Sequence, residues 1–174
     1  VAVQGATAFV GLDSGEVKGV AMESGAVLSG VGVGGRIQDI TVVGRWIYVL
    51  ANGGDGPRLH AFENVSGSLQ LQGTLSLEGS EGAGRRRLRL VAEDSQLFAM
   101  HTAGYNLVSI ANPASPRLVR EVLTSQFGWR HVSPTGGELL LAAADPNSTD
   151  DGDHDLQVYS QTLGGVVVDY AYWD

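Results

Sequence analysis

A hairpin-like phrase recurs along this chain at intervals of roughly forty to fifty residues. In each copy an apolar run is followed by a tight turn and a second apolar run, as at Gly5 in the first copy and Gly44 in the second. The copies begin at Val1, Ile40, Leu90 and Val132. A single hairpin cannot bury its own apolar face, so a repeat of this kind requires neighbouring copies to stack on one another.

The repeat predicts an all-β fold, a β-propeller with four four-stranded blades that form part of a larger ring. We expect the blades to span residues 1–34, 35–79, 80–124 and 125–174 of one propeller. The expected strands are residues 1–3, 6–12, 17–22, 26–33, 37–43, 46–51, 58–63, 68–77, 88–92, 96–101, 105–111, 117–123, 129–133, 138–144, 155–161 and 166–172. The 25 glycines suit many short strands joined by tight turns.

The composition excludes several classes of function. The formal net charge of −8 argues against nucleic acid, whose phosphates require a basic surface. No apolar run reaches the ~20 residues of a membrane-spanning helix, so direct membrane insertion is not expected. The chain has no cysteine for a disulfide, a thiolate metal site or a nucleophile. It starts inside the first repeat, so we expect a piece of a longer protein or a processed product.

One segment of the third copy carries a more specific pattern. Residues 106–119 read NLVSIANPASPRLV, an apolar strand followed by an Asn-Pro-x-x-Pro turn and a strand that opens with Leu-Val. Together with the phrases VAVxGxxAFV and ITVVGxWIYV of the first two copies, this segment resembles the LVIVD-repeat family of bacterial β-propellers. The Asn-Pro-x-x-Pro turn is complete only in the third copy. The resemblance implies four-stranded blades on a secreted, periplasmic or cell-surface bacterial protein.

The repeat alignment places three polar residues at one level of the predicted channel. Asp39, Arg89 and His131 each precede the first residue of a copy, on the strand expected to line the channel. A carboxylate, a guanidinium and an imidazole at one channel mouth could bind a polar ligand or an ion. The alternative interpretation is that they solvate the channel mouth or pair with neighbouring blades.

An acidic segment in the fourth copy is a candidate calcium loop. Aspartate and asparagine oxygens are the hard ligands that Ca²⁺ prefers, and Gly152 permits a tight turn. The candidate ligands are Asp145, Asn147, Asp150, Asp151, Asp153 and Asp155. The spacing departs from the usual calcium-loop pattern, because two residues separate Asn147 from Asp150. A solvated acidic loop, with no cofactor bound, fits the same residues.

The chain ends in an apolar and aromatic strand that we expect at the outer edge of the fourth blade. Tyr170, Tyr172 and Trp173 are its candidate interaction residues. An uncovered strand of this kind readily pairs with another chain, so we expect a neighbouring blade or a partner there.

The favoured function is a non-catalytic binding or scaffold module of a bacterial envelope or extracellular protein, which contacts a protein or a glycan. An enzyme of the propeller lactonase or hydrolase kind, with a channel-mouth metal near Asp39 and His131, is the second alternative. The third is a structural subunit that completes its ring with another chain. Nucleophile-elbow and phosphate-binding glycine motifs are both absent from the sequence, which places the binding module first.

Overall fold

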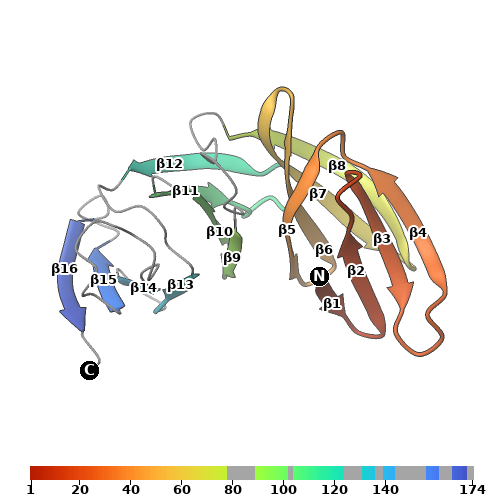
Figure 1. The fold of residues 1–174 in the computed structure, drawn as a ribbon, viewed down its shortest axis with the longest axis horizontal. Coiled ribbons are helices and arrows are strands. Elements are labelled where there is room, and N and C mark those ends of the chain that lie inside the picture. Colours follow the sequence, from red (N-terminus) through yellow and green to blue (C-terminus); the bar gives the residue numbers. More distant parts are fainter. Residues whose placement is uncertain are drawn as a thin grey trace.

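The computed structural model describes residues 1–77, 89–101, 104–123, 131–135, 139–143, 156–160 and 166–171. Sixteen strands in this part of the chain form four antiparallel sheets of four strands each. Within every sheet the strands lie in chain order, so each sheet is an up-and-down meander. We call these sheets blades 1 to 4 in chain order (Figure 1).

Blades 1 and 2 lie entirely within the described residues. The strands of blade 1 are β1 (Ala2–Gln4), β2 (Thr7–Gly11), β3 (Glu16–Ala21) and β4 (Val27–Gly32). The strands of blade 2 are β5 (Arg36–Val43), β6 (Trp46–Gly53), β7 (Gly56–Val65) and β8 (Ser68–Ser76). Each of these strands overlaps the segment predicted for it, which confirms the repeat frame over the first half of the chain.

Blades 3 and 4 repeat the same order. The strands of blade 3 are β9 (Arg89–Glu93), β10 (Gln96–His101), β11 (Gly104–Ser109) and β12 (Arg117–Leu123). The strands of blade 4 are β13 (His131–Pro134), β14 (Leu139–Ala143), β15 (Leu156–Ser160) and β16 (Val166–Ala171). The last strand of the chain is an edge strand of blade 4, as predicted.

The four blades stand side by side in an arc (Figure 1). Their first strands are neighbours, since β1 packs beside β5, β5 beside β9, and β9 beside β13. The fourth strands of blades 1 and 2, β4 and β8, are also in contact. The first strand of each blade is therefore the inner strand of the arc, where the repeat alignment placed the channel lining.

The first turn of each of the first three blades depends on one residue with a left-handed backbone. The inner hairpins have two-residue turns, which begin at Gly5, Gly44 and Asp94 with φ angles of 56°, 57° and 48°. Glycine adopts this conformation freely, and aspartate tolerates it better than most residues. The third copy therefore keeps the same turn without a glycine.

Every blade carries a β-bulge at the same place, between its third and fourth strands. The register shifts at Gly19/Val20, Ala61/Phe62, Leu107/Val108 and Val158/Tyr159. One extra residue of the outer strand is left unpaired at each shift, which bends that strand and increases its twist. The β-bulge therefore recurs in every blade together with the strands.

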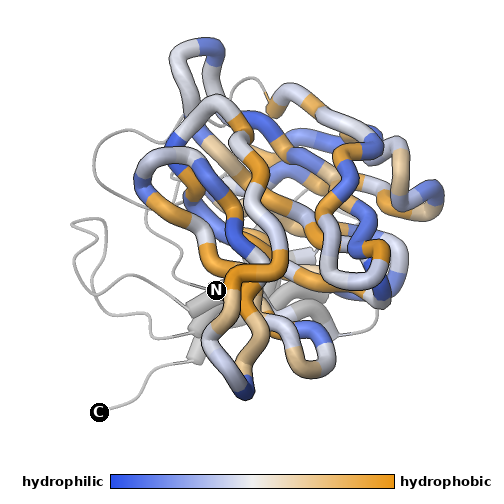
Figure 2. Tube along the Cα trace, turned by 90° about the vertical axis from the view of Figure 1, so that its right-hand side faces the viewer, coloured by the Kyte–Doolittle hydropathy of each residue, from blue (hydrophilic) through white to orange (hydrophobic). Residues whose placement is uncertain are grey.

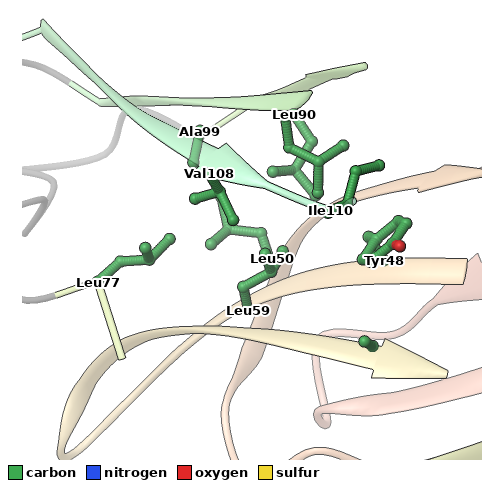
Figure 3. Packing of buried hydrophobic residues seen from close by; sticks show 10 residues of the cluster. Tyr48, Leu50, Leu59, Leu77, Leu90, Ala99, Val108 and Ile110 are labelled. Carbon is green, nitrogen blue, oxygen red and sulfur yellow. The ribbon is translucent and has the colours of Figure 1, made fainter. Parts of the chain in front are cut away.

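Apolar side chains fill the spaces between the blades. Blades 1 and 2 enclose a cluster built on Phe9, Ile47 and Phe62, all fully buried. Blades 2 and 3 enclose a second cluster, in which Leu50 and Leu59 point toward Val108 and Leu90 (Figure 3). Since strands alternate their side chains between two faces, blade 2 contributes to both clusters. The core is thus a series of interfaces between sheets, as the repeat predicted.

The Asn-Pro-x-x-Pro turn of blade 3 packs against blade 2 and is hydrogen-bonded to it. The Pro113 carbonyl oxygen accepts a hydrogen bond of 3.4 Å from the Tyr48 hydroxyl of β6. A methyl group added at Gly73 of β8 would collide with the Ala114 carbonyl and lie 3.4 Å from Pro116 Cδ. The turn therefore lies directly on the backbone of blade 2, and a glycine leaves the space for it.

Candidate functional site

Asp39 joins two blades. Its Oδ1 accepts a hydrogen bond from the Ile40 backbone N–H at 3.0 Å, and its Oδ2 accepts one from the Leu90 N–H at 2.9 Å. Leu90 lies on β9, the inner strand of blade 3. An edge strand leaves alternate N–H groups unpaired, and the carboxylate satisfies one of them. Of the two interpretations drawn from the sequence, pairing with a neighbouring blade is the one that describes this side chain.

Arg89 and His131 occupy the corresponding inner strands but differ from Asp39 chemically. Asp39 pairs across its hairpin with Leu50, and Arg89 pairs with Met100, which are matching positions of the repeat. Arg89 is exposed, and its guanidinium cannot accept a hydrogen bond from the next blade as a carboxylate does. His131 opens β13 opposite Ala143. The inner strands thus bring the three positions to adjacent blades, while a shared ligand for them remains a proposal.

The candidate calcium ligands, Asp145 to Asp155, lie outside the described residues, and so do Tyr172 and Trp173. Tyr170 lies on β16, where it pairs with Gln157 of β15. Calcium binding and the aromatic contact surface therefore stay predictions. Among the described residues, no group of three or more His, Asp or Glu side chains is arranged to hold a metal ion. No helix in that part of the chain is long and apolar enough to span a membrane.

Blade 1 has one apolar face without a neighbouring blade among the described residues. Ala2 and Phe9 point toward blade 2, so the alternating Val1, Val3 and Val10 point to the opposite face. Val1 is 79% exposed and Val3 52% exposed. On blade 2 the matching positions are Ile40, Val42 and Val49, and these pack against blade 1. The outward face of blade 1 therefore carries the same kind of apolar side chains that blade 2 uses to pack against blade 1.

Figure 2 looks onto the side of the molecule where blade 1 lies. Apolar stretches run along the trace on this side, including the part next to the N-terminus, and hydrophilic residues gather at the turns. The exposed Val27 of β4 pairs with Val20, which pairs with Ala8 beside Val3, so it lies in the same cross-strand row of blade 1 as Val3. This distribution agrees with an interface surface on blade 1.

Sequence reasoning missed the buried polar residues between the blades. His60, His101 and Asn106 are at most 7% exposed. Burial lowers the pKa of His101, and burial together with the Arg58 guanidinium lowers the pKa of His60. The signal for His60 was its alternation with Phe62 on β7, since two residues that are two apart share one face of a strand. Histidine motifs depend on sequence neighbours and cannot detect this arrangement.

The comparisons with known proteins identify the architecture. No family model and no curated protein match the sequence. Among solved structures, BamB from Moraxella catarrhalis is similar over 100% of this chain and 52% of its own, with 14% identity and a TM-score of 0.65. Hydrazine synthase from Kuenenia stuttgartiensis is similar over 97% of this chain and 46% of its own, with 16% identity and a TM-score of 0.69.

These neighbours are β-propellers. The chain is a β-propeller. The computationally designed Ika4 protein is similar over 91% of this chain and 88% of its own, with 14% identity and a TM-score of 0.64. The propeller spans about half the length of BamB and of hydrazine synthase. At such low identity the likeness shows the fold alone.

Proposed function

We propose that this propeller is a non-catalytic binding or scaffold module, whose outward blade 1 face contacts a protein partner or further blades. The observation that carries the proposal is the match between Val1, Val3 and Val10 on that face and Ile40, Val42 and Val49 of blade 2, of which Ile40 and Val49 are buried and Val42 is half-buried against blade 1. Large apolar patches on a soluble protein mark interaction sites. The sequence resemblance to LVIVD-repeat propellers supports a secreted, periplasmic or cell-surface bacterial location.

The geometry of Asp39 ranks the enzyme alternative below the binding module. A channel-mouth metal would need the Asp39 carboxylate as a ligand. Each of its oxygens already accepts a hydrogen bond from a backbone N–H group, so the carboxylate has an assigned role in joining blades 2 and 3 and fewer lone pairs left for a metal. A ring completed by a second chain is compatible with the proposal, since the completing chain would cover the same face.

The test combines native mass spectrometry with binding of the dye ANS, which reports exposed apolar surface. We expect either a discrete assembly, or a monomer that binds ANS. Val3→Asp is expected to dissociate the assembly, or to remove ANS binding by the monomer, because a charge cannot be buried unpaired in an apolar interface. Val119→Asp is the matched control, since Val119 is 55% exposed on the outer strand β12. A monomer that binds no ANS, or equal effects of the two variants, contradicts the proposal.

A further inference from the structure

The outward face of blade 1 carries an apolar row that crosses all four strands. Val3 pairs with Ala8, Ala8 pairs with Val20, and Val20 pairs with Val27. We call these four residues the blade 1 row. The register of blade 2 places Val42, Ile47, Phe62 and Leu71 in the matching row. Of these, Val42, Ile47 and Phe62 pack against blade 1. The blade 1 row therefore occupies the positions with which a blade contacts the blade that precedes it.

The opposite contact surface of a blade is marked by one large residue on its second strand. Phe9, Tyr48 and Phe98 each pair with the last third-strand residue before the β-bulge, and all three are fully buried. Phe9 packs against blade 2 and Tyr48 against blade 3. Phe98 lies on the face of blade 3 that points away from blade 2, where it contacts Tyr105 with the ring centroids 5.7 Å apart. We call this register position the bulge position.

Blade 4 has the same register. Leu141 pairs with Val158, the last residue of β15 before the β-bulge of this blade, so Leu141 holds the bulge position. In the first three blades this position belongs to the surface that contacts the following blade. By register, blade 4 therefore presents a leucine where the preceding blades present an aromatic residue.

The arc has two ends that do not meet. Among the described strands, β1 packs beside β5, and no comparable packing joins β1 to β13 (Figure 1). Blade 1 thus has the surface that contacts a preceding blade, and blade 4 has the register of a surface that contacts a following blade. The two ends are complementary in kind, because together they make one blade junction of the type already present between blades 1 and 2.

We propose, on the basis of the interface assigned to blade 1 above, that its occupant is blade 4 of a second copy of this chain. A two-fold axis along the channel places blade 4 of each copy on blade 1 of the other, so two identical contacts close one ring. The length of the chain supports this arrangement, since it spans about half of BamB, a propeller formed in one chain.

One charged residue on the same face needs an account. Lys18 pairs with Val10 in the same way that His60 pairs with Val49, so it holds the position of a buried residue of blade 2. The Lys18 Nζ lies 3.5 Å from the Glu16 Oε2. Covering this face therefore does not bury an unpaired ammonium group, and the long side chain can keep its charge at the rim of the contact.

Single cysteines test the contact directly, because the sequence contains none. Ala2 on β1 and Val42 on β5 both border the cluster between blades 1 and 2. The matching pair across the proposed contact is Ser133 of one copy and Val3 of the other, since Ser133 pairs with Leu141 as Ala2 pairs with Phe9. Val3 and Ser133 are both exposed in the single chain, so replacing either one leaves the fold intact.

The Val3→Cys and Ser133→Cys proteins are refolded together from urea and treated with a short bismaleimide. The mixture is expected to give a covalent dimer, whereas neither variant alone does, because a two-fold ring keeps identical positions on opposite sides. Val119→Cys mixed with Ser133→Cys is the matched control and is expected to stay uncoupled, and Ala2→Cys/Val42→Cys is the positive control within one chain. A covalent dimer of Val3→Cys alone would mean that blade 1 contacts blade 1, and would overturn the proposal.

Sedimentation separates this proposal from the more general one. The unmodified chain is expected to sediment as two chains, and Val3→Asp as one. A monomer that loses ANS binding in Val3→Asp keeps the interface on blade 1 but overturns a second copy as its occupant. A dimer that Val3→Asp leaves intact, or a monomer that binds no ANS, overturns both.

Discussion

The Asp39 carboxylate of blade 2 accepts a hydrogen bond of 2.9 Å from the backbone N–H of Leu90 in blade 3. These residues are 51 positions apart in the sequence, yet the bond joins two adjacent inner strands. Together with the hydrogen bond from the Tyr48 hydroxyl to the Pro113 carbonyl, it adds polar links to the apolar packing between blades 2 and 3. Of the two interpretations that the sequence left open for Asp39, this bond matches pairing with a neighbouring blade.

Replacing Asp39 tests this link. Asp39→Ala is expected to lower the free energy of unfolding by about 2 kcal/mol, because it leaves the Leu90 N–H without a charged acceptor. Urea unfolding measures the change. Asp13→Ala is the control, since it removes the exposed Asp13–Arg36 pair and is expected to cost less than ~0.5 kcal/mol. Equal effects of the two substitutions would show that the bond contributes no special stability.

Gly73 tests the docking of the Asn-Pro-x-x-Pro turn. Gly73→Ala is expected to destabilise the protein by about 1–3 kcal/mol, because the methyl group overlaps the Ala114 carbonyl. At Gly32 the same change meets open space at an ordinary φ, so Gly32→Ala is expected to be neutral or slightly stabilising. Thermal unfolding of the two variants side by side measures the difference, and an unchanged Gly73→Ala protein contradicts the close packing of the turn.

The buried Tyr48 hydroxyl is expected to make the free energy of unfolding fall at alkaline pH. Burial raises the pKa of its hydroxyl to about 12 from the ordinary value of 10.0. The unfolded chain ionises first, so this stability is complete below pH 10 and is lost as the pH rises toward 12. The loss is expected to be on the order of 2 kcal/mol and to disappear in Tyr48→Phe. Unfolding free energies measured between pH 9 and 12 check this, and equal slopes for the two proteins would exclude it.

The buried imidazoles of His60 and His101 are expected to make the free energy of unfolding fall at acidic pH. Their pKa values are lowered from 6.5, mainly because burial disfavours the charged ring. Stability is therefore complete above pH 6.5 and falls as the pH drops through the lowered values, since the unfolded chain takes up protons first. The double variant His60→Leu/His101→Leu is expected to show a flatter profile in urea unfolding between pH 7.5 and 5. An unchanged profile would assign the acid sensitivity to other groups.

Much of the fold was predictable from local pattern. The alternation of apolar residues defined the sixteen strands, and the recurrence of glycine at Gly5 and Gly44 located the turns. The third copy shows the limit of this reasoning, because its turn residue is Asp94, with φ at 48°. The β-bulges between the third and fourth strands of the blades were not predicted, since an extra residue in a strand leaves no mark when only one side of the pairing is known.

The candidate site was predictable only in part. The repeat alignment placed Asp39 and Arg89 on adjacent inner strands, but it could not show that the Asp39 oxygens bond to backbone N–H groups. The blade 1 face that has no neighbour among the described residues escaped prediction, because the alternation of Val3 and Val20 along their strands is the same whether or not another blade covers them.

The sequence by itself determined that the chain forms repeated four-stranded units and where those units begin. It could do so because strand alternation and turn chemistry are properties of neighbouring residues. Only the tertiary structure decided which polar side chains join blades and which are buried between them. Those roles depend on atoms brought together from different blades, such as Asp39 with Leu90, and on the burial that leaves His60 Nε2 without a partner among the described residues.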